Sequence, residues 1–207
     1  MSEIFHVLHV AKELVELIDE GANDMLPKKI ASTVKDCSKG AAIASVAAGV
    51  LPGVGGIAAV TVSAGFIWGM YLKINSDIGV SISSNILKTL ASGIATNLLI
   101  YATGCLAGVA IASIASFLPV VGTAVSCATM GLLCYILTLA SGFIYLKLLV
   151  HLFRAGVDIN SINRMSADEL KNVAKTVCNK DEIKDVMKAA RAEYKKDEKN
   201  GEFNQSK

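Results

Sequence analysis

The sequence predicts an all-α, helical integral membrane protein with two apolar helical hairpins, each turned by proline and glycine, flanked by amphipathic helices on the cytosolic side. Residues 89–146 contain no Asp, Glu, Lys, Arg or His, and residues 40–72 form a second uncharged stretch. A Leu-Pro-x-Val-Gly segment interrupts each stretch. Because a charged side chain at the centre of a membrane helix costs about 2.5–3.5 kcal/mol, a bilayer selects for such runs.

The composition agrees with this fold class and limits the functions open to the chain. Of its 207 residues, 53% are hydrophobic and 18% are charged, which makes it more apolar than a typical soluble domain. The net charge of +2 is small and dispersed, so we expect no nucleic acid partner. The five cysteines are widely spaced and include no Cys-x-x-Cys pair, so we expect reduced thiols and no metal or other cofactor.

Residues 1–39 are predicted to contain an amphipathic helix and a linker. Apolar residues recur at helical spacing over residues 2–20, and the helix is expected to end near Gly21. Interfacial membrane helices usually have a polar face rich in Lys and Arg, whereas this face is acidic. Packing against another protein helix is therefore favoured over lying in a membrane interface.

Residues 40–155 are predicted to form the membrane hairpins, and they contain an internal repeat. Ala-Ile-Ala-Ser precedes a Leu-Pro-x-Val-Gly segment twice, within residues 42–55 and again within 110–122. Proline removes a helical hydrogen bond and glycine relaxes the backbone, so each segment is predicted to turn the chain between two helices. A chance match between sequences rich in Ala, Gly and Ser is the alternative. The predicted turn residues are Pro52, Gly53, Gly55, Pro119 and Gly122.

The lengths of the arms distinguish the two hairpins. As helices, arms 89–117 and 120–146 would each be ~40 Å long, which is enough to cross a ~30 Å hydrocarbon core. Arms 41–51 and 57–72 would reach only ~16 and ~24 Å, so the first apolar region is either a shallow hairpin or one kinked span. Basic residues flank the apolar runs but not the turns, which favours both hairpins entering from the cytoplasm and both termini remaining there.

Small residues four positions apart predict helix packing within the apolar runs, because in lipid they let helix backbones approach closely. The contacts are predicted within the chain, with contacts between copies of a homo-oligomer as the alternative. Asn97 is the one strongly polar side chain of its run, and it is predicted to make an interhelical hydrogen bond, with a pore-lining role as the alternative. The predicted packing residues are Gly65, Gly69, Gly104 and Gly108.

No catalytic site is predicted. The uncharged runs contain hydroxyl and thiol groups but no acid, base or histidine that could activate them. The glycine-rich segment 49–56 lacks the Gly-Lys-Ser/Thr ending of a phosphate-binding loop, so we interpret it as a turn. Glu3, His6, His9 and Glu13 occupy adjoining helical positions, where a polar surface is favoured over a metal site because no second ligand-bearing helix is evident.

Residues 156–207 are predicted to form a soluble helical hairpin and a disordered tail. Ser166 and Glu169 have the spacing of a capping box, which would open a helix reaching about Cys178. A second helix with an apolar stripe follows. This hairpin is expected to dock on the N-terminal helix, and the mixed-charge tail 195–207 to be disordered.

The region from Leu51 to about Arg154 resembles the GTPase-associated, YcjF-type membrane domain of unknown function. The similarity rests on the two Leu-Pro-x-Val-Gly segments, on Ile78-Gly79, on the helix from Leu87 and on the last apolar helix, and it covers about half the chain. That family occurs beside, or fused to, small-GTPase-like domains, so the resemblance implies a helical membrane module. No GTPase signature is present here, so the implied GTPase partner would be a separate polypeptide. The resemblance supplies no catalytic residues.

The predicted function is non-enzymatic: a membrane-anchored helical protein that presents cytoplasmic helices to a protein partner, with a GTPase implied by the resemblance. The lipid bilayer is its other partner. The alternative is an oligomeric pore, or a membrane-perturbing effector whose apolar hairpin can also be stored in a soluble bundle. Scarce polar residues in the spans disfavour a hydrophilic pathway, while the small-residue faces allow oligomers.

Overall fold

The computed structural model describes residues 4–19, 24–49, 55–105 and 123–203, and within these ranges every regular element is helical. The predicted all-α class is therefore confirmed. The helices are α1 (Ile4–Ile18), α2 (Met25–Gly49), α3 (Gly55–Ile78), α4 (Ser84–Cys105), α6 (Thr123–Arg154), α7 (Ile159–Arg164), α8 (Ala167–Thr176) and α9 (Lys180–Lys199).

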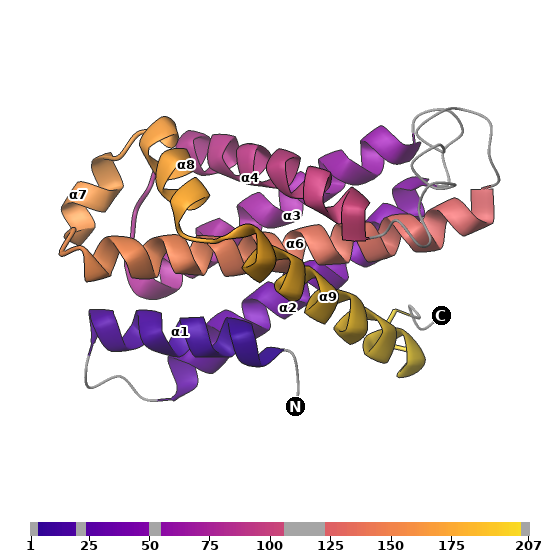
Figure 1. Ribbon diagram of the computed structural model, residues 1–207, viewed down its shortest axis with the longest axis horizontal. Helices are drawn as coiled ribbons and strands as arrows, with labels where there is room; N and C mark the ends of the chain where they lie inside the picture. Colours follow the sequence, from indigo (N-terminus) through magenta and orange to yellow (C-terminus); the bar gives the residue numbers. More distant parts are fainter. Residues whose placement is uncertain (1–3, 20–23, 50–54, 106–122, 204–207) are drawn as a thin grey trace.

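The longest described helix, α6, runs along the long axis of the molecule (Figure 1). It contacts α1, α2, α3, α4, α8 and α9, so helices cover it from several directions. Between Met130 and Val150 every residue except Lys147 is buried. A helix that is apolar all round is stable only in a protein core or in lipid, and here the chain itself provides the cover.

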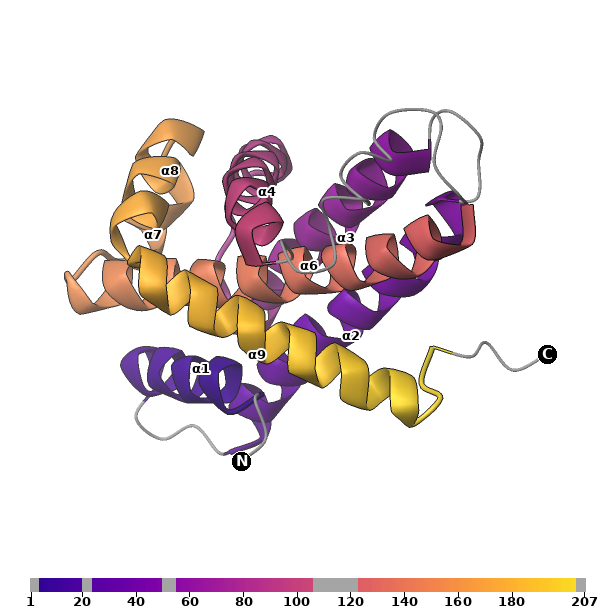
Figure 2. The same cartoon turned by 45° about the vertical axis from the view of Figure 1, so that its right-hand side comes forward.

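The other helices pack around α6 in two groups. In one group α2 and α3 pack against each other and against α6, and α1 covers α2 and α6. In the other group α4 and α8 lie next to each other and α9 crosses α6 (Figures 1 and 2). The expected docking of the C-terminal hairpin on α1 is wrong, since α8 and α9 pack mainly against α4 and α6. The apolar stripe of α1 is already buried against α2 and α6.

Local sequence signals explain where several helices begin and end. The capping box is confirmed: Glu169 N donates to Ser166 Oγ at 3.3 Å, and Ser166 N donates to Glu169 Oε2 at 2.7 Å. Gly79 and Gly156 follow α3 and α6 with a φ of +74°, a conformation that favours glycine. The N-terminal amphipathic helix is confirmed as α1. Its buried apolar residues are Val7, Val10, Ala11, Leu14 and Val15.

The predicted boundary at residue 39 falls inside a helix. The linker and the first apolar arm form one continuous helix, α2, from Met25 to Gly49. Gly40 lies within it without ending it. A Cβ at Gly40 would lie 2.5 Å from Phe66 Cε1, so the glycine is needed for the close approach of α3.

The tail predicted to be disordered from residue 195 is helical at its start. The last helix, α9, continues to Lys199. Buried Asp197 lies within this extension, only 1% exposed, and its carboxylate has cationic and hydroxyl partners on α2 and α6. A buried, bonded carboxylate of this kind holds the helix against the core, which the mixed charge of the tail does not reveal.

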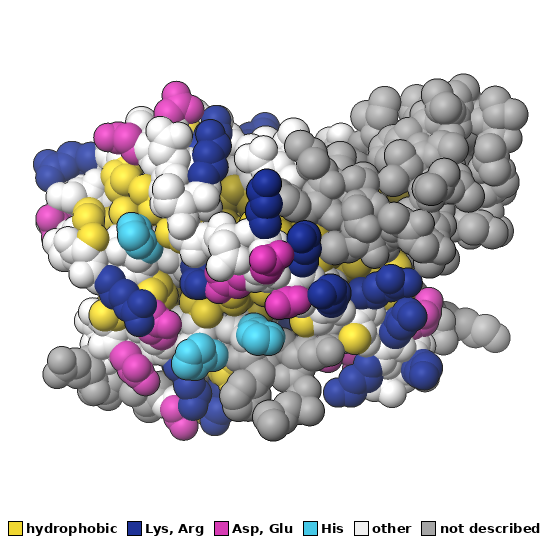
Figure 3. All heavy atoms as spheres, viewed as in Figure 1, with side chains coloured by type: hydrophobic (Ala, Val, Ile, Leu, Met, Phe, Trp, Pro, Cys, Tyr) yellow, Lys and Arg dark blue, Asp and Glu magenta, His cyan; other side chains and the backbone are white. Residues whose placement is uncertain are grey.

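Among the described residues, one helical segment, Met130–Arg154, is long and apolar enough to cross a membrane. It passes by length and composition only, and 94% of its most apolar window is buried within the chain, as in the core helix of a soluble protein. Figure 3 shows charged side chains distributed over one face, with no broad hydrophobic belt among the described residues. The described large hydrophobic side chains that are exposed are Leu17, Met25 and Leu72. Insertion of two hairpins stays a prediction.

Four helix ends point toward the same end of the molecule. The C-terminal ends of α2 and α4 and the N-terminal ends of α3 and α6 lie toward the right-hand side of Figure 1, and α7 lies at the opposite end. The sequence that adjoins those four ends, residues 47–60 and 99–129, contains no charged residue. We refer to this as the uncharged end.

Two of the predicted turn and packing residues lie at the described ends of helices. Gly55 is the first residue of α3, and Gly104 lies in the last turn of α4. Pro52, Gly53, Gly108, Pro119 and Gly122 lie outside the described residues, so the predictions for them stay predictions.

Gly65 and Gly69 do not bring two helices together among the described residues. Both are exposed, and a Cβ at either position would meet no other atom within 4 Å beyond its own helix and neighbours. The predicted packing within the chain is thus not found for this pair in the described part of the chain, and packing between copies stays a prediction. Helices approach closely at two other glycines of α6 instead. A Cβ at Gly131 would lie 2.8 Å from Val46 Cγ2, and one at Gly142 would lie 2.7 Å from Val34 Cγ1.

We therefore expect Gly142→Leu to destabilise the fold, because the added side chain would overlap Val34 of α2. Overpacking of this kind typically costs about 1–3 kcal/mol and is expected to lower the midpoint of thermal unfolding by several degrees, as followed by circular dichroism. Gly65→Leu is the matched control and should change the midpoint little. Loss of stability in the control with none in Gly142→Leu would contradict the observed packing.

Candidate functional site

A groove of about 1180 Å³ lies where α4 faces α8 and the start of α9. In Figures 1 and 2, α4 and α8 lie above α6, and α9 crosses α6. The volume of the groove exceeds the ~300–1,000 Å³ typical of small-molecule sites. The groove therefore has room for a ligand larger than a simple ion.

The floor of the groove is apolar and comes from four helices. Ile94 and Leu98 belong to α4, Ile144 to α6, Ala174 to α8, and Ile183 to α9. Each of these side chains is buried or half-buried, so the floor is continuous with the hydrophobic core. Such a floor would hold an apolar ligand group away from water.

Apart from Lys88, the polar residues that α4 contributes to the groove are uncharged. Thr89, Ser92 and Thr96 line it, and each hydroxyl donates a hydrogen bond to a backbone carbonyl of its own helix at 2.8–2.9 Å. The oxygen lone pairs and the side chain of Asn97 remain available to a ligand. Asn97 is exposed and has no hydrogen bond to any described residue. The predicted interhelical hydrogen bond of Asn97 is thus not found in this part of the chain, and Asn97 lines the groove instead.

The charged residues that line the groove are all lysines: Lys88, Lys171, Lys175 and Lys180. Lys171 pairs with exposed Asp168 at 3.4 Å, whereas the other three have no ion pair with a described residue. In Figure 3, lysine and arginine side chains lie over this part of the surface, with hydrophobic side chains visible between them. The arrangement gives the groove a positive rim above an apolar floor.

Carboxylates close to the groove are already engaged with other lysines. Glu182 pairs with Lys147, and Asp181 pairs with Lys184 at 3.2 Å. The positive charge of the rim is therefore not neutralised by these acids.

The thiol in the groove is not a nucleophile. Cys178 is 8% exposed, and burial together with the nearby Glu182 carboxylate raises its pKa to about 12, against the opposing effect of Lys147. Almost none of it is thiolate near pH 7. No described histidine lines the groove to activate it.

The histidines of α1 are not gathered into a metal centre in the part of the chain that the structure describes, where no three potential ligands converge. His6 and His9 are exposed on α1. Glu13 instead pairs with Arg154 at the end of α6, with Glu13 Oε1 2.8 Å from the guanidinium.

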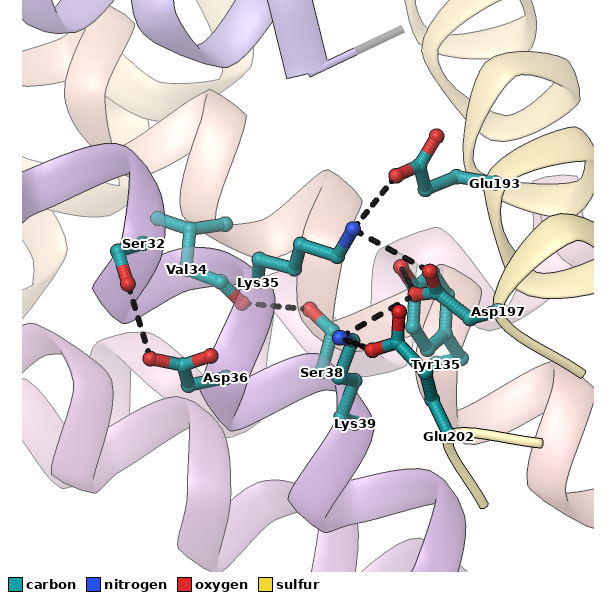
Figure 4. Close-up of polar contacts among 10 residues, drawn as sticks. All are labelled: Ser32, Val34, Lys35, Asp36, Ser38, Lys39, Tyr135, Glu193, Asp197 and Glu202. Atoms are coloured by element: carbon teal, nitrogen blue, oxygen red, sulfur yellow. Dashed lines mark hydrogen bonds and ion pairs between the residues drawn. The ribbon is translucent and has the colours of Figure 1, made fainter. Parts of the chain in front are cut away.

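A second polar cluster, which we call the α9 ionic network, ties the C-terminal helix to α2 and α6 (Figure 4). Lys35 of α2 lies 2.6 Å from Glu193 and 3.2 Å from Asp197 of α9. Tyr135 of α6 donates its hydroxyl to Asp197 at 3.1 Å. Lys39 of α2 pairs with Glu202, beyond the end of α9.

Burial of its carboxylates strengthens the ion pairs of this network and makes the loss of any one partner costly in free energy. Glu193 and Asp197 are only 3% and 1% exposed. Burial, the largest single influence, lowers the pKa of Lys35, but the hydrogen bonds and charges of Glu193 and Asp197 together outweigh it and raise the net pKa above 10.5. Lys35 is therefore held in its charged form.

A third polar cluster joins α3 to α6. The rings of Tyr71 and Tyr145 stack with centroids 3.9 Å apart. The hydroxyl of Tyr145 donates to Asn75 Oδ1 at 2.5 Å, and that of Tyr71 lies 2.6 Å from Ser141 Oγ. All four residues are buried.

Sequence reasoning missed both the rim of the groove and the α9 ionic network. Lys171 and Lys175 are four residues apart, which places them on one face of α8. Asp197 follows Tyr194 by three residues, so it continues the apolar stripe of α9. Both signals are present in the sequence, but neither identifies the helix that faces them.

Comparison with protein-family models, with curated proteins and with solved structures finds no match to this chain. The resemblance to the YcjF-type domain therefore stays a prediction.

We expect Lys35→Met to loosen α9, because the change leaves two buried carboxylates without their closest cation. Breaking a buried ion pair typically costs about 3–5 kcal/mol. Urea unfolding should report the loss, and amide hydrogen exchange should accelerate in residues 191–199. Lys188→Met removes an exposed pair with Asp185 and should change stability by less than about 1 kcal/mol. Equal losses of unfolding free energy in the two variants would show that the α9 ionic network stabilises the fold no more than an exposed ion pair does.

The stabilising contribution of Lys35 should also depend on pH. Its folded-state pKa is raised above 10.5, so the contribution is fully present below pH 10.5 and is lost as the pH rises through the folded-state value. The difference in unfolding free energy between the wild type and Lys35→Met should therefore be constant below pH 10 and shrink above it. If the difference in unfolding free energy does not shrink above pH 10, the raised folded-state pKa of Lys35 does not contribute to stability as stated here.

Proposed function

We propose that this chain is a non-enzymatic membrane-docking protein. Its uncharged end enters the bilayer, while the charged helices α1, α8 and α9 stay on the cytoplasmic side and face a protein partner. The observation that carries the proposal is the direction of the helices: the C-terminal ends of α2 and α4 and the N-terminal ends of α3 and α6 lie toward one side of the molecule, and the sequence that adjoins these ends is uncharged.

The charges of the chain support this orientation. Residues 47–60 and 99–129 meet no desolvation cost from side-chain charge on entering lipid. Lysines and arginines lie on the remainder of the chain, which favours the cytoplasmic side for the charged helices. The two hairpins would then enter from one side, with both termini in the cytoplasm.

The protein partner would meet polar surfaces rather than the apolar stripes of the terminal helices. The stripes of α1 and α9 are buried against neighbouring helices of the same chain. Exposed lysines and carboxylates of α8 and α9 are available for a charge-complementary contact. A separate GTPase-like polypeptide is the partner implied by the resemblance.

A second candidate is a membrane-perturbing effector that stores α6 in a soluble bundle and releases it into lipid. The observation that favours it is the 94% burial of the apolar window of α6. In this candidate α1, α2 and α9 form a cover that must open before insertion, whereas docking by the uncharged end leaves them in place.

We expect the full chain to float with neutral phosphatidylcholine vesicles in a density gradient and to resist alkaline carbonate, because apolar burial holds it there. Val121→Lys places a charge in the uncharged run and should reduce the bound fraction by about tenfold or more. Asn160→Lys adds the same charge in α7 at the opposite end and should bind like the wild type. A wild-type chain that remains a soluble monomer would refute docking.

Lys35→Met separates the two candidates in the same assay. If α6 must be released, loosening α9 should increase the fraction bound to vesicles. If the uncharged end docks with the bundle closed, binding should be unchanged.

A further inference from the structure

The three unpaired lysines of the groove give it an anion-binding rim. Lys88, Lys175 and Lys180 come from three different helices, so folding brings together charges that are far apart in the sequence. No carboxylate is among the described residues that line the groove, and Glu182 and Asp181, which adjoin the lining residues in sequence, pair with Lys147 and Lys184. A ligand that binds here would therefore carry negative charge.

The floor adds a second requirement. Ile94, Leu98 and Ile183 line the same groove as the lysines, and long lysine side chains can lay their methylene groups along an apolar surface while the charge stays in water. A free phosphate or a nucleotide would leave this floor uncovered. An anion with an attached hydrocarbon chain matches both parts of the groove.

The position of the groove connects it to the bilayer. Asn97 and Leu98, which line it, immediately precede the uncharged run 99–129. A groove beside the segment that enters lipid would lie at the level of the headgroups, where basic pockets bind anionic lipids.

We propose that the groove between α4, α8 and α9 binds an anionic phospholipid, with the phosphate among Lys88, Lys175 and Lys180 and an acyl chain along Ile94, Leu98 and Ile183. The proposal rests on the proposed function for the source of the lipid. An acidic protein helix is the competing occupant, and charge alone would suit it. The lipid is favoured because α4 leads directly from the groove into the uncharged end.

The test uses the full chain in neutral maltoside micelles, titrated with dihexanoyl phosphatidylglycerol and followed by isothermal titration calorimetry. The triple change Lys88→Gln, Lys175→Gln and Lys180→Gln should weaken binding on the order of 100-fold, since each lysine near an anionic lipid contributes about fivefold. The matched control changes three exposed lysines elsewhere on α9, Lys195→Gln, Lys196→Gln and Lys199→Gln, and should bind like the wild type. Dihexanoyl phosphatidylcholine should bind at least tenfold more weakly than the anionic lipid.

Gly93→Leu provides a variant that changes no charge. A Cβ at Gly93 would already lie 3.1 Å from Lys171 Cε, so a leucine would fill the groove. We expect it to abolish lipid binding with an unchanged circular dichroism spectrum. Equal losses in both lysine triples, or full binding by Gly93→Leu, would overturn the proposal, and so would tighter, lysine-dependent binding of a glutamate-rich helical peptide.

The outcome is independent of membrane docking. Groove-dependent binding of the short-chain lipid by a chain that fails to float with vesicles would refute docking and leave the lipid site standing. Flotation with neutral vesicles that is unaffected in the lysine triple, together with no binding of the short-chain lipid, would leave docking standing and refute the site.

Discussion

A helix that is apolar on all of its faces must be covered on all of them, and most of this fold can be understood as the cover of α6. Its buried surface extends from Met130 to Val150. α1, α2 and α9 are amphipathic and turn their apolar stripes inward, so that charged side chains remain in water. Gly131 and Gly142 allow α2 to approach α6 closely enough to complete this enclosure. The same enclosure leaves the apolar helix without a lipid-facing side while the bundle is closed.

Apolar packing alone would permit the covering helices to slide, and buried polar contacts fix their positions. The stacked rings of Tyr71 and Tyr145, with Asn75 and Ser141, set the register of α3 on α6. The α9 ionic network sets that of α9 on α2. A displaced helix would leave these groups buried without partners, which is costly.

Periodicity predicted the elements of this fold but not their partners. The stripe of α1 and the capping box at Ser166 depend on residues within one turn or two of a helix, and both were predicted correctly. Spacing alone misled at Gly65 and Gly69, since small residues four apart predict a packing face but not which face turns inward. The groove could not be predicted from the sequence, for a related reason. Its lysines and Asn97 lie on three helices, and their meeting depends on tertiary contacts that no local pattern contains. The burial of Asp197 could not be predicted from the mixed charge of the tail, because the partners of Asp197 lie on α2 and α6 and are distant in sequence.

The placement of the α9 ionic network at the C-terminal end of the chain also bears on biosynthesis. Lys35 and Tyr135 are synthesised well before Glu193 and Asp197, which complete their contacts. At about 5–20 residues per second, several seconds separate the completion of α6 from that of α9. During this interval α6 lacks one of its covering helices. The order of the helices along the chain thus leaves an interval during synthesis in which the apolar surface of α6 is incompletely covered, and this interval ends when α9 completes the bundle.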